Sequence, residues 1–166
     1  MQKSSHELLI RGLNDAGVKY LLVGGLAVNA HGYLRSTVDV DLIVRLDTAN
    51  LLPALAVLKS LGSAPRVPVP IESFADPELR QSWIRDKHMK VFSLRSDKHA
   101  ETEVYLFADD PLGFDRAYGD AVHVEIATGL QATICSLDDL LELKRQADRD
   151  KDRIDIQKLK EIHDRP

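Results

Sequence analysis

Tyr20-Leu-Leu-Val-Gly-Gly-Leu-Ala-Val28 and Arg35-Ser-Thr-Val-Asp-Val-Asp-Leu-Ile-Val44 decide the fold of this chain. The first joins an apolar run to a pair of glycines, and the second places Asp39 and Asp41 within a strand pattern. Successive strand side chains point to opposite faces, so the two carboxylates share one face, about 6.6 Å apart along the strand at roughly 3.3 Å per residue. Their repulsion would be relieved by one divalent cation, or by two cations about 3.5–4 Å apart.

The aspartate face has a second interpretation, because half-exposed strands also carry polar residues on the side that faces solvent. Ile43, however, continues this face as an apolar residue. The carboxylates are therefore expected at the mouth of a cleft rather than along an open surface.

Composition limits the class of protein. The 166 residues are expected to form a single domain, 1–166, and the apolar (44%) and charged (29%) fractions are those of a globular protein. A net charge of −4 argues against broad, nonspecific coating of nucleic acid. The lone Cys135 excludes an internal disulfide, and the six histidines form no zinc pattern with it. Neither a signal core nor a membrane-length apolar run is present, so we expect a cytoplasmic protein and no membrane partner.

The order of predicted elements gives an α/β (α+β) fold with a mixed central sheet flanked by helices, two of them C-terminal. A first helix follows a capping box at Ser4 and ends at Gly17. Further helices are expected at 26–30, 48–61, 137–147 and 152–163. Strands are expected at 18–23, 38–44, 89–95, 102–107, 121–126 and 130–135. The proline-rich segment 63–77 is predicted to be an irregular connection or a sheet edge.

Gly24 and Gly25 lie between a predicted strand and a predicted helix. Glycines at such a junction let backbone N–H groups approach an anion, because no side chain obstructs it. Taken alone, the pair is more typical of a tight turn. Beside Asp39 and Asp41, it becomes a candidate phosphate cradle that faces a candidate metal site.

Three charged residues near the C-terminus fall on faces that should point inward. Lys144 lies in the apolar stripe of its helix, where it either extends to water or meets a phosphate or a carboxylate. Asp152 and Asp155 align with Ile156, Leu159 and Ile162, the residues of the last helix expected to face inward, although carboxylates also favour a first helical turn for its dipole. All three turning inward is harder to attribute to chance than any one alone.

These motifs together resemble the nucleotidyltransferase superfamily, which has the polymerase-beta-like fold. The signature is Val23-Gly-Gly, a spacer and Asp39-Val-Asp41-Leu. Flanking residues and the closing segments Ser136-Leu-Asp-Asp-Leu-Leu-Glu-Leu-Lys144 and Arg149-Asp-Lys-Asp-Arg-Ile-Asp155 resemble the bacterial branch that includes abortive-infection type nucleotidyltransferase toxins. The resemblance extends from about residue 18 to residue 159.

The resemblance implies roles by position. In this family the glycine pair contacts the triphosphate, the two aspartates hold Mg²⁺, with two ions possible, a lysine meets the nucleotide phosphates, and a late acidic residue completes the site. The corresponding residues here are Gly24 and Gly25, Asp39 and Asp41, Lys144, and Asp152. Arg35 and Asp155 match less specific positions, of which Arg35 is a nucleotide-binding candidate, and both have a structural alternative.

A third carboxylate of the family is replaced in this chain. Aligned on Asp110-Pro-Leu-Gly-Phe114, its position on the neighbouring strand holds Tyr105. Glu103 lies two residues earlier, on the same face, and is the candidate that its longer side chain allows. Either Glu103 supplies the missing group, or the third ligand is absent.

The resemblance implies a metal-dependent nucleotidyltransferase that moves a nucleoside monophosphate from a nucleoside triphosphate to an acceptor hydroxyl and releases pyrophosphate. The acceptor would be RNA, a protein or a small molecule, with RNA and a toxin–antitoxin setting favoured, and a cognate antitoxin would then be a partner. The alternative is a catalytically silent module that binds nucleotide or a partner protein. An antibiotic-modifying enzyme is a third option, which should show an acidic cleft for a cationic drug.

Overall fold

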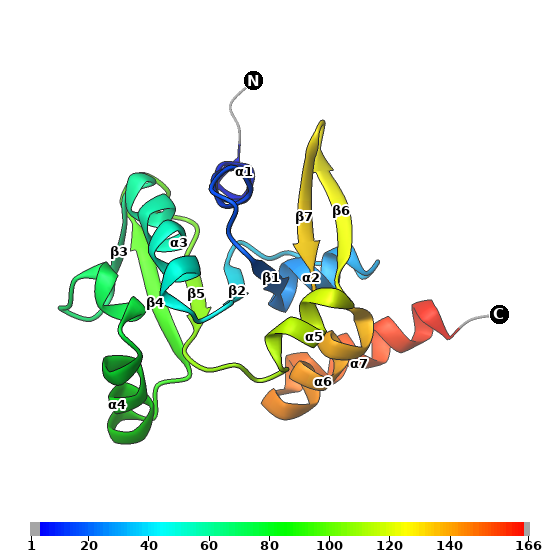
Figure 1. The fold of residues 1–166 in the computed structure, drawn as a ribbon. Coiled ribbons are helices and arrows are strands. Elements are labelled where there is room, and N and C mark those ends of the chain that lie inside the picture. The colour runs from blue at the N-terminus through cyan, green and yellow to red at the C-terminus, as the bar shows by residue number, and fades with distance from the viewer. Residues whose placement is uncertain (1–3, 165–166) are drawn as a thin grey trace.

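A mixed sheet of seven strands forms the centre of the protein in a computed structural model that describes residues 4–164 (Figure 1). Its strands in chain order are β1 Tyr20–Val23, β2 Val40–Val44, β3 Ser63–Pro65, β4 Val91–Ser96, β5 Val104–Phe107, β6 Val122–Ala127 and β7 Leu130–Ile134. Across the sheet the order is β3-β4-β5-β2-β1-β7-β6. The central pairs β2–β5 and β1–β7 are parallel and the others are antiparallel, which confirms the predicted mixed sheet.

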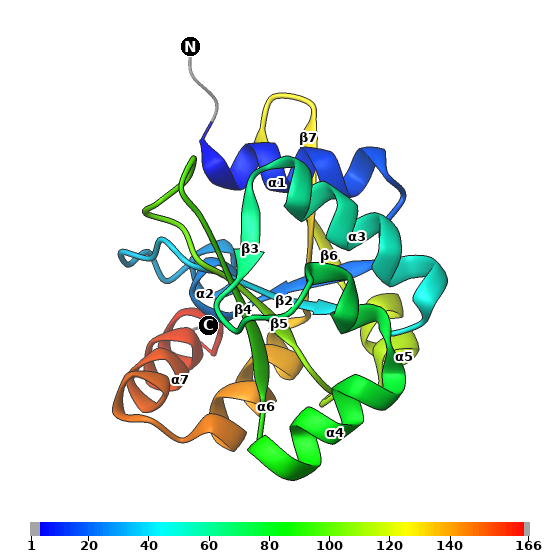
Figure 2. The ribbon, with the colours of Figure 1, turned by 90° about the vertical axis from the view of Figure 1, so that its left-hand side faces the viewer.

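Helices flank this sheet on both faces. They are α1 Ser5–Asp15, α2 Gly24–Ala30, α3 Thr48–Ser60, the 3₁₀ helix η1 Ile71–Ala75, α4 Pro77–Lys87, α5 Phe114–Gly119, α6 Leu137–Ala147 and α7 Asp150–His163. Figures 1 and 2 place α1 and α3 together over one face of the sheet and α6 and α7 together beyond the other, next to α2. Within residues 4–164, no helix has the length and apolar character needed to cross a bilayer.

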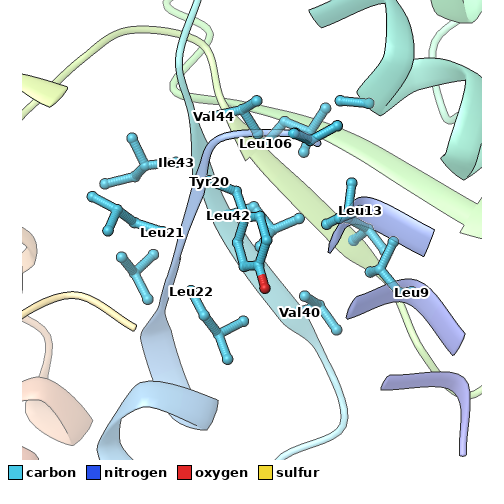
Figure 3. Packing of buried hydrophobic residues seen from close by; sticks show 14 of the residues in the cluster. Leu9, Leu13, Tyr20, Leu21, Leu22, Val40, Leu42, Ile43, Val44 and Leu106 are labelled. Carbon is cyan, nitrogen blue, oxygen red and sulfur yellow. The ribbon is translucent and has the colours of Figure 1, made fainter. Parts of the chain in front are cut away.

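The alternation of the central strands separates the core from the site. Figure 3 shows Tyr20 and Leu42 on the side of the sheet that faces Leu13 of α1, whereas Leu21 and Ile43 point to the other side. All five side chains are at most 1% exposed. Because residues two apart share a face, Asp41 in β2 and Asp39 just before it lie on the same side of the sheet as Ile43.

Local signals place most elements as predicted. Ser4 accepts a hydrogen bond from the Glu7 amide at the start of α1, and Ser136 accepts one from the Asp139 amide at the start of α6. Both are the capping interactions expected at helix N-termini. The proline-rich segment 63–77 contains the edge strand β3 and the short helix η1, in agreement with the prediction.

Two helices were not predicted. In α4 only Arg80 and Trp83 are buried, and α5 has only six residues, so neither carries a long apolar stripe. Signals for α4 were nevertheless present, because Asp76 caps it and Pro77 occupies its first turn. In α7, Ile162 is 41% exposed, so the inward stripe predicted for that helix ends at Leu159.

Candidate functional site

Asp39, which directly precedes β2, and Asp41 within β2 line a cavity of about 360 Å³ between the sheet and the α6–α7 pair, here named the aspartate cavity. Its polar lining comes from α2, segment 33–39, β2, β5, α6 and the start of α7. The polar lining residues are Gly24, Gly25, Arg35, Thr37, Asp39, Asp41, Tyr105, Lys144, Arg149, Lys151 and Asp152. The volume is within the range usual for small-molecule sites.

Along segment 33–39, side chains that face the aspartate cavity alternate with side chains that face solvent. The segment has no regular secondary structure, yet Arg35, Thr37 and Asp39 are partly buried and the residues between them are exposed. The segment leads into β2, where Asp41 continues the same face. A run of extended backbone therefore presents four polar residues to the aspartate cavity at every second position.

The two glycines make room for this segment. Gly24 has a φ of +67°, which favours glycine, and a Cβ built on it would lie 2.7 Å from Cγ of Asp41 and closer still to Oδ2. A Cβ on Gly25 would lie 2.6 Å from Oγ1 of Thr37. The glycines thus begin α2 directly, rather than forming a separate turn before it, and allow the close approach of Asp41 and Thr37.

The surroundings of Asp41 disfavour its ionised form. Burial, followed by the charge of Asp39, raises its pKa, and the positive charges of Lys144, Lys151 and Arg149 oppose that rise. Within residues 4–164, no group of three or more His, Cys, Asp or Glu side chains is placed to hold a metal ion. The protein therefore offers a cation two carboxylates here, a donor set that suits Mg²⁺, which usually keeps several waters.

An ion network ties α7 to the rest of the site, here named the α6–α7 network. Lys144 Nζ on α6 lies 3.0 Å from Asp152 and 2.9 Å from Asp155 on α7. Arg35 donates two hydrogen bonds of 2.9 Å to Asp155, and Arg149 donates one of 2.7 Å to Asp152. Because Arg35 belongs to segment 33–39, the same network holds the segment that carries Asp39.

The pKa values of both acids of this network are lowered in spite of their burial. Desolvation opposes ionisation of Asp152, but hydrogen bonds from Arg149 and Lys144 outweigh it and lower its pKa. Burial acts in the same way on Asp155, and hydrogen bonds from Arg35 and Lys144 again leave the pKa lowered. Lys144, Asp152 and Asp155 all point inward, as the sequence suggested, and they meet one another.

The strand next to β2 brings Tyr105 rather than an acid to the aspartates. Tyr105 is the register partner of Asp41 and lines the aspartate cavity, whereas Glu103 is not among the lining residues. Glu103 is held by Arg66 and accepts a 2.8 Å hydrogen bond from the Tyr105 hydroxyl. This hydrogen bond raises the pKa of Tyr105 to about 12, and Arg66 lowers the pKa of Glu103.

Several lining residues were not predicted from the sequence. The apolar part of the wall is formed by Val23, Val91, Phe107, Leu140, Leu143 and Ala147. On the polar side, Thr37, Arg149 and Lys151 were missed. A signal for Lys151 existed, because it lies four residues before Asp155 and so on the same helix face. Thr37 follows the two-residue alternation of the aspartates.

Solved structures with a similar fold include antibiotic-modifying enzymes. The lincosamide antibiotic adenylyltransferase LnuA, lincomycin-bound, matches with a TM-score of 0.60 at 16% identity, over 96% of this chain and 98% of that chain. ANT(2″)-Ia in complex with adenylyl-2″-tobramycin matches with a TM-score of 0.53 at 14% identity, over 93% of this chain and 83% of that chain. Neither a family model nor a curated protein matches the sequence. The chain therefore has the nucleotidyltransferase fold.

Proposed function

We propose that this protein is a metal-dependent nucleotidyltransferase that transfers a nucleoside monophosphate from a nucleoside triphosphate to an acceptor hydroxyl. The observation that carries the proposal is that Asp39 and Asp41 line the aspartate cavity beside Gly24, together with Arg149 and Lys151 from the start of α7. Carboxylates for a cation and cations for phosphate thus share one cavity. The nucleotidyltransferase fold agrees with this reading.

Asp39 and Asp41 would hold Mg²⁺. The raised pKa of Asp41 supports this, since a dication beside it would offset both the burial of its charge and the repulsion from Asp39. When bound, the metal supplies positive charge to the phosphate oxygens as charge develops on them. Gly24 and Gly25 would contact the triphosphate through their backbone, and Arg35 is held beside Gly25 by Asp155.

The remaining predicted residues would act mainly by positioning. Lys144 and Asp152 fix α7 against α6, and through Asp155 they fix the segment that carries Asp39. Glu103 would act through Tyr105, which its carboxylate orients, rather than at the reacting atoms. Catalysis of this type depends on orientation and on electrostatic stabilisation, so a rigid frame of this kind contributes directly to rate.

Two observations favour different classes of acceptor molecule. The resemblance to abortive-infection toxins favours an RNA hydroxyl and a cognate antitoxin, whereas the similar structures are enzymes whose bound molecules are lincomycin and an adenylylated tobramycin. The aspartate cavity presents four cationic side chains, at residues 35, 144, 149 and 151. Three carboxylates within residues 4–164 line the same cavity, but Asp152 is paired with Lys144 and Arg149, and Asp39 and Asp41 would hold the metal. Among these described residues, no acidic surface is therefore left over for a polycationic drug, and we favour RNA.

Transfer of label tests the function. The protein is incubated with each α-labelled nucleoside triphosphate and Mg²⁺, and with total RNA, cell protein, a lincosamide or an aminoglycoside as acceptor. We expect label on RNA, and its loss in Asp39→Asn and Asp41→Asn. Label on a drug or a protein would replace the favoured acceptor. Absence of aspartate-dependent label from all four would refute the enzymatic proposal.

A silent nucleotide-binding module is the second candidate. The observation in its favour is Tyr105, which pairs with Asp41 where the family has a third carboxylate, while Glu103 is engaged by Arg66. Under this alternative, wild-type protein binds triphosphate without transfer, and Tyr105→Asp gains transfer. Tyr105→Phe is the control, because it removes the hydroxyl without adding a carboxylate. Activity of the wild type that Tyr105→Asp does not raise would argue against the silent module.

A further inference from the structure

We propose that Lys151, rather than Lys144, is the lysine that contacts the triphosphate, and that Lys144 is a structural residue of the α6–α7 network. The inference rests on the proposed function and reassigns one residue within it. It follows from how the positive charges around the aspartate cavity are distributed among partners.

The charge of Lys144 is already committed. Its ammonium lies 3.0 Å from Asp152 and 2.9 Å from Asp155, and its side chain is only 6% exposed. The side chains of its two partners are 0% and 2% exposed. Moving the ammonium to a phosphate would leave two buried carboxylates with less compensation, a change that is strongly unfavourable.

Both arginines of the aspartate cavity are committed as well. Arg35 forms a two-pronged pair with Asp155, the arrangement that guanidinium groups make best. Arg149 donates to Asp152 at 2.7 Å and 3.3 Å, although its side chain is 59% exposed. The positive charge of Arg149 can therefore still attract an anionic ligand, but its hydrogen bonds are made to Asp152.

Lys151 differs from these three residues. It is exposed, it lines the aspartate cavity, and it has no ion-pair partner within residues 4–164. Its side chain lines the same cavity as Asp41 and Asp152, so it lies on the cavity side of α7 rather than on the outer face. A flexible lysine stem with a free ammonium suits a phosphate that arrives with the nucleotide.

The aspartate cavity thus divides its cations between two tasks. Lys144 and Arg35 hold the walls in place and are already neutralised when no ligand is bound. Lys151 carries the charge that remains for a ligand, and it lines the same cavity as the carboxylates that would hold the metal. A polyphosphate bound between them would have Mg²⁺ on one side and the Lys151 ammonium on the other.

Binding of inorganic tripolyphosphate and of a non-hydrolysable nucleoside triphosphate, each with Mg²⁺, tests the inference by calorimetry. We expect Lys151→Ala to weaken both about tenfold, the usual scale for losing one hydrogen bond to a charged group. Lys151→Arg should restore most of the affinity, and the corresponding nucleoside monophosphate should lose much less. Lys160→Ala is the matched control, because Lys160 is also exposed on α7 and does not line the aspartate cavity.

The outcomes separate this inference from the proposed function. Wild-type affinity in Lys151→Ala, with the control also unchanged, would overturn the role of Lys151 and leave the function standing. An equal loss in Lys160→Ala would overturn it too, because any exposed lysine of α7 would then have the same effect. If the wild type binds neither triphosphate, the proposed function fails together with this inference. Thermal unfolding of each variant verifies that it is folded.

Discussion

Replacing Gly24 by alanine should disable the aspartate cavity while leaving the fold intact. Gly24 has a φ of +67°, and a Cβ there would lie 2.7 Å from Cγ and 2.9 Å from Cβ of Asp41. These are separations that real Cβ atoms essentially never show, so the carboxylate must move out of its position. Gly17 offers a matched control, because it has the same φ of +67° and a Cβ there would meet nothing within 4 Å.

Comparison with Gly17→Ala separates two contributions to the expected loss in the free energy of unfolding. Both variants place alanine in the left-handed region, which costs about 1–2 kcal/mol. Only Gly24→Ala adds an overpacking cost of about 1–3 kcal/mol as Asp41 is displaced. Gly17→Ala should therefore lower the free energy of unfolding by about 1–2 kcal/mol, and Gly24→Ala by about 2–5 kcal/mol.

Urea denaturation measures the unfolding free energies, and Mn²⁺ titration in the presence of a non-hydrolysable triphosphate measures the site. We expect Gly24→Ala to weaken Mn²⁺ binding at least tenfold, about 1.4 kcal/mol, and Gly17→Ala to leave it unchanged. Wild-type Mn²⁺ affinity in a folded Gly24→Ala protein would show that the position of Asp41 beside Gly24 has no part in binding the metal, contrary to this prediction.

Three further predictions concern buried charge. Lys144→Met should lower the free energy of unfolding by about 3–5 kcal/mol, because it leaves two buried carboxylates without their shared cation. As a control, replacing the exposed Arg145 by methionine should lower it by no more than about 1 kcal/mol, and equal losses in urea denaturation would contradict the prediction. Without metal, Asp41→Asn should stabilise the protein at neutral pH, because burial and Asp39 raise the pKa of Asp41 and so disfavour its ionised form. That advantage should shrink as pH falls through the raised pKa, and a difference independent of pH would count against it. The pKa of Asp155 is lowered in the folded state, so this residue contributes stability that is present above its unfolded pKa of about 3.9 and is lost as pH falls through the lower folded value. Asp155→Asn should therefore make the unfolding free energy depend less on pH in the acid range, as followed by circular dichroism. An unchanged acid dependence would contradict this prediction.

The central part of the fold could be read from the sequence because its signals are local. The alternation around Asp39 and Asp41, the cap at Ser4 and the cap at Ser136 each depend on residues a few positions apart. The structure places these elements as expected. It also places both aspartates in one cavity with Gly24, which follows once β1 and β2 pair.

Partners distant in the chain could not be read in this way. Inward positions were predicted for Lys144 and Asp155, but the pairing with Arg35 joins residues 120 positions apart. Nothing local indicates that Arg66 holds Glu103, since Arg66 lies in an irregular proline-rich stretch. The helices α4 and α5 were missed because they bury too few residues to give a helical period.

Mn²⁺ binding followed by electron paramagnetic resonance, with a non-hydrolysable triphosphate present, tests directly whether Asp39 and Asp41 hold the metal. We expect saturable Mn²⁺ binding to the wild type that is lost in the Asp39→Asn/Asp41→Asn double variant, although that variant stays folded. Binding of equal strength and stoichiometry in the double variant would contradict the claim that these two carboxylates hold the metal.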